Sequence, residues 1–210
     1  MKPTSPAAAL DAGIAGLGLA PNAAQRAALL TLLDELREWS GRFNLTAIRD
    51  PLEIVSKHLL DSLSLQPWLH GTRIADVGTG AGFPGLPLAI MNPALQFTLI
   101  ESVGKKARFV AHAAARLGLG NVEVVNARAE AWRPDRPFDT VVCRAVGRVA
   151  EFIRIAGHLC APDGRLLAMK GRHPRAELAH LPRGWRLLGV HPLEVPGLAA
   201  ERHVVELIRA

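Results

Sequence analysis

The chain has 210 residues, 49% of them hydrophobic, and a formal net charge of +6, which suits one folded domain with a small appendage. No apolar run reaches the ~18 residues of a membrane span, and Asp11 interrupts the Ala-rich start, which argues against a signal peptide. The two cysteines, Cys143 and Cys160, cannot form a disulfide framework and lie in apolar segments, as is typical of reduced cytoplasmic proteins.

The first 70 residues are predicted to form a helical N-terminal extension without strands. Residues 22–43 have an apolar stripe at helical spacing. A second predicted helix begins at Pro51 and continues to about Leu65, with apolar residues again at helical spacing. Residues 1–20 show no pattern to which we assign a role.

Residues 71–210 are predicted to form a single α/β unit. Strands expected at 73–78, 96–101, 122–126, 138–143 and 165–170 alternate with helices expected at 84–92, 105–117 and 148–160. Such alternation indicates a parallel sheet with helices on both faces. Two more strand-like runs, 185–195 and 203–208, follow a basic link at 170–186 and predict an antiparallel C-terminal hairpin, which makes seven strands.

The most informative stretch is the end of the first strand. There an apolar run is followed by glycines at alternate positions, Gly78, Gly80 and Gly82, and then by a predicted helix. A strand that passes through a glycine turn into a helix lets a polar ligand approach the backbone.

Residues 80–85 match the dinucleotide pattern G-x-G-x-x-G, but three features argue against NAD. The carboxylate of Asp76, two residues before the first glycine, would repel a pyrophosphate, whereas it can brace the loop or accept hydrogen bonds from a cationic ligand. No second domain is left for a hydride-transfer site, and the chain has no tyrosine for a Tyr/Lys acid-base pair.

Glu101, 19 residues after Gly82, ends the second predicted strand, where a carboxylate can bind both ribose hydroxyls. A ligand with a ribose, a base and a charged tail fits this pair of features. S-adenosylmethionine has all three, since its tail carries a carboxylate for loop amides and an ammonium for acidic groups. The alternative is a helix-packing glycine turn beside a surface glutamate.

Several motifs together resemble one family. They are residues 76–88 (DVGTGAGFPGLPL), 44–51 (NLTAIRDP), 58–62 (HLLDS), 101–106 (ESVGKK), 144–146 (RAV), 170–171 (KG) and 201–203 (ERH). Over residues 25–209 the chain resembles the RsmG (GidB) family of 16S ribosomal RNA guanine-N7 methyltransferases. One departure is Glu101, which stands where an aspartate is common.

The resemblance implies a Rossmann-like class I methyltransferase fold and transfer of a methyl group from S-adenosylmethionine to N7 of guanine 527 of 16S rRNA. The partner would be 16S rRNA or the small ribosomal subunit, in the cytoplasm, and we expect a monomer. The resemblance also implies that Gly78 and Phe83 line the cofactor, that Ala129 and Glu130 hold the adenine, and that Arg144 lies beside the cofactor.

Guanine N7 carries a lone pair and no proton, so no general base is expected and alignment of the reactants is the main requirement. Arg144 is the candidate catalytic residue, with a positioning role: it would contact a phosphate or guanine O6, or form a structural ion pair with Glu130 or Asp76. Cys143 raises the alternative of covalent pyrimidine methylation, but a buried strand thiol is favoured because no proline precedes it.

His58 and Asp61 share one helix face, but no third candidate ligand is spaced nearby, so we expect no metal ion there. These two side chains would either form a hydrogen-bond network that anchors the helical extension to the sheet and shapes the pocket, which is favoured, or contact RNA together with Asn44 and Arg49.

The basic residues lie mainly in the second part: residues 1–70 contain 6 Lys and Arg against 7 Asp and Glu, and residues 71–210 contain 19 against 12. This bias favours nucleic-acid binding, although arginine-rich codon usage would also produce it. The predicted RNA contacts at the carboxyl ends of strands are Lys105, Lys106, Arg148, Lys170, Arg172 and Arg175. The remaining alternatives are a methyltransferase with another RNA or a small-molecule target, or a non-catalytic RNA-binding protein.

Overall fold

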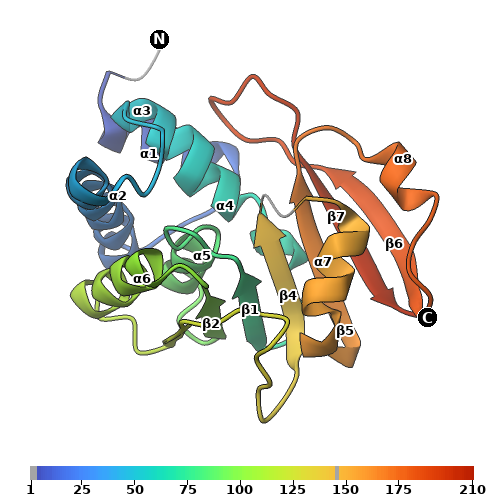
Figure 1. Cartoon of the computed structure of the whole chain (residues 1–210). Helices are drawn as coiled ribbons and strands as arrows, with labels where there is room; N and C mark the ends of the chain where they lie inside the picture. Colours follow the sequence, from blue (N-terminus) through green and yellow to red (C-terminus); the bar gives the residue numbers. More distant parts are fainter. Residues whose placement is uncertain (1–3, 145–146) are drawn as a thin grey trace.

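A seven-stranded sheet runs through the centre of the molecule in the order β3-β2-β1-β4-β5-β7-β6 (Figure 1). The computed structural model describes residues 4–144 and 147–210, so part of the 144–146 motif lies outside the described residues. The strands are β1 (Arg73–Val77), β2 (Gln96–Ile100), β3 (Val122–Val125), β4 (Phe138–Arg144), β5 (Cys160–Lys170), β6 (Trp185–Pro192) and β7 (His203–Arg209).

Strands β1 to β5 pair in parallel, β7 is antiparallel to β5, and β6 is antiparallel to β7. The predicted α/β fold, a mostly parallel seven-stranded sheet closed by a C-terminal hairpin, is therefore confirmed. In this order the chain reverses direction across the sheet between β1 and β4, where ligands bind in open α/β sheets.

Successive strand residues point to opposite faces of the sheet and enter two separate apolar layers. In β4 the buried side chain of Val142 belongs to one layer and that of Val141 to the other. Leu167 and Leu166 divide in the same way in β5. Both faces are therefore covered, as a parallel sheet requires.

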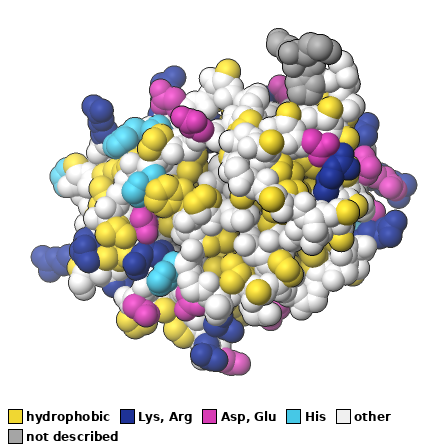
Figure 2. Space-filling model, turned by 180° about the vertical axis from the view of Figure 1, so that it is seen from behind, with side chains coloured by type: hydrophobic (Ala, Val, Ile, Leu, Met, Phe, Trp, Pro, Cys, Tyr) yellow, Lys and Arg dark blue, Asp and Glu magenta, His cyan; other side chains and the backbone are white. Residues whose placement is uncertain are grey.

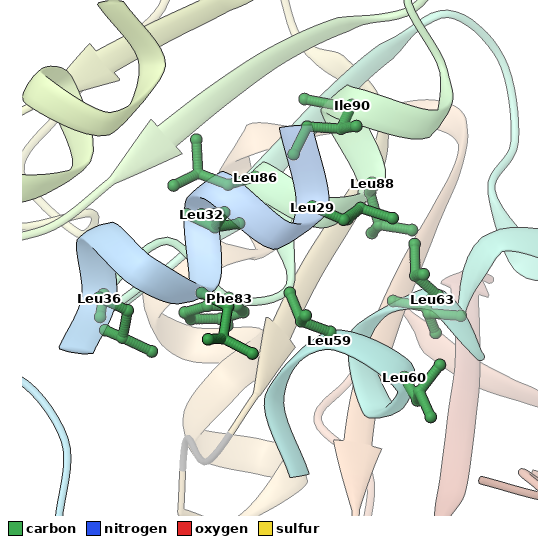
Figure 3. Packing of buried hydrophobic residues seen from close by; sticks show 14 of the residues in the cluster. Leu29, Leu32, Leu36, Leu59, Leu60, Leu63, Phe83, Leu86, Leu88 and Ile90 are labelled. Atoms are coloured by element: carbon green, nitrogen blue, oxygen red, sulfur yellow. The ribbon is translucent and has the colours of Figure 1, made fainter. Parts of the chain in front are cut away.

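The larger layer lies under the N-terminal helices together with α5 (Gly85–Met91) and α6 (Gly104–Arg116). The N-terminal helices are α1 (Pro6–Gly16), α2 (Ala23–Phe43) and the run α3 (Pro51–Ile54), η1 (Val55–Leu60) and α4 (Asp61–Leu63), followed by the 3-10 turn η2 (Gln66–Trp68). Figure 3 shows leucines of α2 and of the 59–63 run gathered with Phe83 and the apolar residues of α5. Because residues 4–70 share this layer with the sheet, their division from residues 71–210 stays a prediction.

The opposite layer is covered by α7 (Val149–Ala156), the 3-10 turn η3 (Gly157–Leu159) and the short α8 (Arg175–Leu178). Residues 126–137, between β3 and β4, contain no helix, and Ala129 and Trp132 pack there instead. No helix in the described part of the chain is long and apolar enough to cross a membrane.

Three elements differ from the sequence prediction. Helix α1 was not predicted, although Ser5 caps it and Pro6 occupies its first position. The predicted helix at 51–65 is present but contains a π-helical turn, Val55–Leu60. Strand β5 begins at Cys160, five residues before the predicted start, because the chain turns from η3 directly into the sheet opposite Phe138.

Candidate functional site

The glycine turn after β1 has backbone angles that favour glycine. Gly78, Gly80 and Gly82 have φ values of 67°, 62° and 86°. A side chain at Gly78 would meet no atom within 4 Å, so this part of the turn faces open space. The turn therefore leaves its backbone accessible to a ligand at the carboxyl ends of β1 and β2.

Asp76 lies beneath this turn and is fully buried. Its Oδ2 accepts hydrogen bonds from the Thr79 hydroxyl at 2.6 Å and from the Gly85 amide at 2.8 Å, while its Oδ1 has no partner among the described residues. Burial raises the pKa of the Asp76 carboxyl to about 6, against the lowering effect of these two hydrogen bonds. The geometry favours the bracing role over direct ligand contact.

Glu101, which follows β2, is 5% exposed and connects the turn to the start of α6. Its carboxylate accepts from the Gly80 amide at 2.9 Å and from the Val103 amide at 2.8 Å. The carboxylate is thus held beside the glycine turn, where it was predicted to bind a ribose.

A hollow of about 390 Å³ opens in front of the turn. We call it the glycine-loop hollow; it is lined by Leu45, Thr46, His58, Gly78, Thr79, Gly80, Ala81, Phe83, Glu101, Lys106 and Arg144. Glycine backbone, one carboxylate, an aromatic side chain and two cations therefore surround one space. Of the predicted cofactor residues, Asp76, Gly82, Ala129 and Glu130 are not in the lining: Ala129 is buried against the second apolar layer and Glu130 is exposed.

Arg144, at the end of β4, is held by the 55–63 run of the N-terminal helices. Its Nη1 donates to the Lys57 carbonyl at 3.0 Å and to Asp61 Oδ2 at 3.1 Å, and its Nη2 lies 3.2 Å from His58 Nδ1. The guanidinium also lies 5.5 Å from the centre of the Phe83 ring. The ion pair expected with Asp76 or Glu130 is instead made with Asp61.

Asp61 has a second cationic partner that the sequence analysis did not identify. Its Oδ1 accepts from Arg202 Nε at 2.9 Å, so one buried carboxylate joins two guanidiniums from β4 and the loop before β7. The only sequence signal for this contact was the 201–203 motif, and a local motif does not show which distant residue its side chains contact.

His58 packs between these groups. Its ring is stacked on Phe83 with ring centres 4.9 Å apart, and its Nε2 lies 2.9 Å from the Thr46 hydroxyl. Burial, reinforced by the charge of Arg144, lowers the pKa of His58 to about 4, so the ring is neutral at neutral pH.

A second hollow, of about 490 Å³, adjoins the first and shares His58 and Arg144 with it. We call it the strand-end hollow; it is lined by Ile48, Lys57, His58, Asp61, Arg144, Met169, Lys170, Gly171 and Arg202. It lies at the carboxyl ends of β4 and β5, and its lining combines apolar side chains with Lys and Arg side chains.

The remaining predicted RNA residues fall into two groups. Arg49 donates to the Ser40 carbonyl and to Asn44 Oδ1, both at 2.8 Å, and Lys170 is bonded to the Gly147 carbonyl and to Glu177. These side chains have partners within the protein.

Lys105, Arg148, Arg172 and Arg175 are exposed, and Lys106 lines the glycine-loop hollow. Figure 2, which views the molecule from behind, shows basic side chains toward the margins of that face, with acidic ones between them rather than a uniform basic patch.

Cys143 is buried in β4 and does not line either hollow. Within residues 4–144 and 147–210 there is no group of three or more His, Cys, Asp or Glu side chains placed to hold a metal ion. Among the described residues, these observations therefore identify neither Cys143 as a nucleophile facing the hollows nor a set of metal ligands.

Comparisons with known proteins agree with one another. The family described as rRNA small subunit methyltransferase G matches residues 25–205. The chain is 52% identical over 203 residues to Ribosomal RNA small subunit methyltransferase G of Stenotrophomonas maltophilia, covering 97% of this chain and 95% of that protein. It is 49% identical over 208 residues to the protein of the same name from Aromatoleum aromaticum, covering 97% and 99%.

Among solved structures, a SAM dependent methyltransferase from Aquifex aeolicus superposes with a TM-score of 0.56 at 20% identity, covering 76% of this chain and 94% of that one. At this identity the likeness shows a shared fold. The sheet is therefore of the Rossmann-like methyltransferase type.

Proposed function

Since the chain belongs to the rRNA small subunit methyltransferase G family, we propose that it transfers the methyl group of S-adenosylmethionine to N7 of guanine 527 in 16S rRNA. The observation that carries this proposal is the pair of adjoining hollows that share Arg144 and His58. One hollow has the features of a nucleoside site, and the other lies beside it at the carboxyl ends of β4 and β5.

The glycine-loop hollow fits S-adenosylmethionine, which supplies an activated methyl group when bound. The turn carries no side chains at Gly78 and Gly80, which lets the tail of the ligand approach the backbone closely. Glu101, whose carboxylate is held by the Gly80 and Val103 amides, can still accept from ribose hydroxyls. Phe83 provides an apolar face in the same hollow. In this proposal Asp76 acts by fixing the turn, through Thr79 and Gly85.

The adenine would lie farther along β2 and β3, beside Ala129 and Glu130. Both residues follow β3 in the helix-free segment that packs against Ile100. This assignment rests on the family resemblance, and it extends the cofactor site beyond the residues that line the glycine-loop hollow.

The target guanine would enter the strand-end hollow with N7 toward the shared wall. In guanine the O6 atom lies beside N7 on the same edge of the base, so O6 would face the Arg144 guanidinium, which can only donate hydrogen bonds. Adenine presents an amino donor at that position, and a guanidinium cannot accept from it. Arg144 thus positions the acceptor and selects guanine, and no general base is needed because N7 has no proton.

The partners that follow from the proposal are 16S rRNA or the small ribosomal subunit, and we propose that the protein acts on them in the cytoplasm as a monomer. The exposed cations Lys105, Arg148 and Arg172, together with Lys106 in the lining of the glycine-loop hollow, would contact phosphates. Asn44, Arg49, His58 and Lys170 are bonded within the protein, so their proposed role is to shape the site.

The direct test is to map 7-methylguanosine in 16S rRNA from cells with and without this gene, and after complementation. We expect the modification at position 527 to disappear and to return with the wild-type chain but not with Arg144→Ala. Calorimetry with S-adenosylmethionine should show binding that Glu101→Ala weakens. An unchanged methylation map would refute the proposed target, and absence of cofactor binding would refute the proposed reaction.

A further inference from the structure

His58 is one of the two residues that both hollows share, and its ring contacts an aromatic side chain, a guanidinium and a hydroxyl. Its ring stacks on Phe83 of the cofactor turn, at 4.9 Å between ring centres. Its Nδ1 lies 3.2 Å from Arg144 Nη2, and its Nε2 lies 2.9 Å from the Thr46 hydroxyl. Both ring nitrogens therefore have partners within the protein, which leaves the ring no free atom for proton transfer.

The partners determine which ring nitrogen carries the proton. A guanidinium can only donate, so Nδ1 must accept from Arg144. The proton of a neutral ring then lies on Nε2, from which it is donated to the Thr46 hydroxyl oxygen. That oxygen also accepts from the Ile48 amide at 3.2 Å, which fixes its position at the start of the loop after α2.

His58 belongs to the π-helical turn Val55–Leu60, and the preceding residue, Lys57, offers its carbonyl to the same guanidinium. π-helical turns occur frequently at functional sites. One turn thus presents two acceptors, a carbonyl and a ring nitrogen, to two different nitrogens of Arg144. The direction of the guanidinium is set by a segment outside the strand that carries it.

We propose that His58 is a positioning residue, whose neutral ring in the Nε2–H form orients the Arg144 guanidinium into the strand-end hollow. Because the same ring stacks on Phe83, the orientation of the guanidinium depends on the cofactor turn. This inference rests on the proposed function, since it assigns to Arg144 the contact with the acceptor base. The low pKa of His58, about 4, agrees with a ring that stays neutral during turnover. The charged side chains that face it are Arg144 and Lys57, and both disfavour its protonation, whereas the Lys57 carbonyl favours it but is outweighed by burial and the charge of Arg144.

Two variants separate the acceptor from the ring. His58→Phe keeps a ring against Phe83 but removes the acceptor for Arg144, whereas His58→Asn loses the ring but can place an amide oxygen near the Nδ1 position. We expect His58→Phe to lower kcat on small-subunit RNA roughly ten- to a hundredfold, as for loss of a hydrogen bond to a charged group. His58→Asn should recover a large part of that loss.

The affinity for S-adenosylmethionine, measured by calorimetry, should change by less than about threefold in His58→Phe because the stacking is kept. The matched control is His112→Phe, which should leave kcat unchanged: the His112 ring lies outside both hollows and packs in a tilted arrangement against Trp39, with ring centres 4.8 Å apart. Unfolding midpoints of all variants identify any that fail through folding.

A readout independent of activity is the two-bond 1H–15N spectrum of the wild-type histidine rings. For His58 we expect the pattern of a neutral ring protonated on Nε2 at pH 7, and Thr46→Val should alter the Nε2 signal. A ring protonated on Nδ1, or a charged one, would overturn the proposal even if every variant misfolded. So would a folded His58→Phe with unchanged kcat, or a loss confined to cofactor affinity. Failure of the proposed function is recognised separately, by wild-type protein that does not methylate guanine.

Discussion

At the scale of single residues, the site contains two buried titratable groups whose pKa values shift in opposite directions. Burial raises the pKa of Asp76 to about 6 and lowers that of His58 to about 4. In both cases burial disfavours the charged form, and the positive charge of Arg144 favours the carboxylate and disfavours the imidazolium. At neutral pH the site thus holds an anion beneath the turn and a neutral ring beside it.

The His58 shift predicts a pH dependence of stability. Because the folded-state pKa lies below the ordinary value of 6.5, the unfolded chain binds a proton that the folded chain does not. His58 therefore destabilises the fold as the pH falls from about 6.5 to 4, by up to about 3 kcal/mol at pH 4. Urea unfolding of wild type and His58→Gln from pH 7 to 4 should show the free-energy difference moving in favour of the variant at low pH.

Asp76 acts with the opposite sign over an overlapping range, since its raised pKa makes the folded chain hold a proton more tightly than the unfolded one between about pH 4 and 6. The wild-type curve alone can therefore appear flat. The difference between wild type and His58→Gln removes the Asp76 contribution, and a difference that stays constant with pH would contradict the assigned shift.

Cys143 provides a second residue-scale prediction. The thiol is buried in β4, one residue before Arg144, and lines neither hollow. Cys143→Ala should therefore keep methyl transfer within about threefold of wild type, with only a modest loss of stability. Loss of turnover in a folded variant with normal cofactor affinity would instead support covalent catalysis.

At the scale of elements, the N-terminal helix α1 is bound to the segment that holds Arg144. Gly13 of α1 lies so close to Leu60 that a side chain there would clash, and Leu10 is fully buried. Leu10→Ala should lower the free energy of unfolding by about 2–4 kcal/mol in a denaturant titration. The control is Leu188→Ala on β6, where 46% exposure predicts a change within about 0.5 kcal/mol.

A Leu10→Ala effect no larger than that of the control would mean that α1 contributes no core packing. A variant that is destabilised but fully active would instead show that α1 supports the fold without affecting the π-helical turn.

The elements that sequence could predict are those with a strong local pattern. The parallel strands are rich in apolar residues, and the glycine turn is specified by residues adjacent in the chain. Both were predicted, although β5 begins five residues before its predicted start. Helix α1 has apolar residues all round rather than a stripe, and only its cap at Ser5 and Pro6 marks it. The π-helical turn left no signal because its sequence also fits an ordinary helix.

The contacts that sequence could not predict are ion pairs whose partners have no regular spacing along the chain. Lys170 was predicted to bind RNA from its charge and its place at a strand end, but Glu177 lies close enough to form an ion pair with it at 2.9 Å. Arg202 meets Asp61 across 141 positions of the chain. Charge is visible in a sequence, whereas the availability of a charge depends on its neighbours in space.

At the scale of the whole molecule, this distinction between free and paired cations predicts how RNA binding depends on salt. Arg172 is exposed and has no side-chain partner among the described residues, whereas Lys170 two residues earlier is 12% exposed and paired with Glu177. Each phosphate contact to a single strand contributes about 0.7 to the slope of log K against log salt. Arg172→Ala should therefore reduce the slope by about 0.7, and Lys170→Ala should leave it unchanged while lowering stability.

The measurement is binding of a labelled RNA containing the target loop, in filter or anisotropy titrations from about 50 to about 300 mM salt, a range over which the Debye length falls from about 14 to about 6 Å. Arg186→Ala is the matched control, because Arg186 is also exposed but lies on the edge strand β6, where it pairs with Ile208 at the end of β7 opposite the one beside Lys170. It should not change the slope. If Arg186→Ala and Arg172→Ala reduce the slope equally, RNA binds through diffuse charge rather than along the site. If all three variants keep the wild-type slope, the RNA strand lies elsewhere on the molecule.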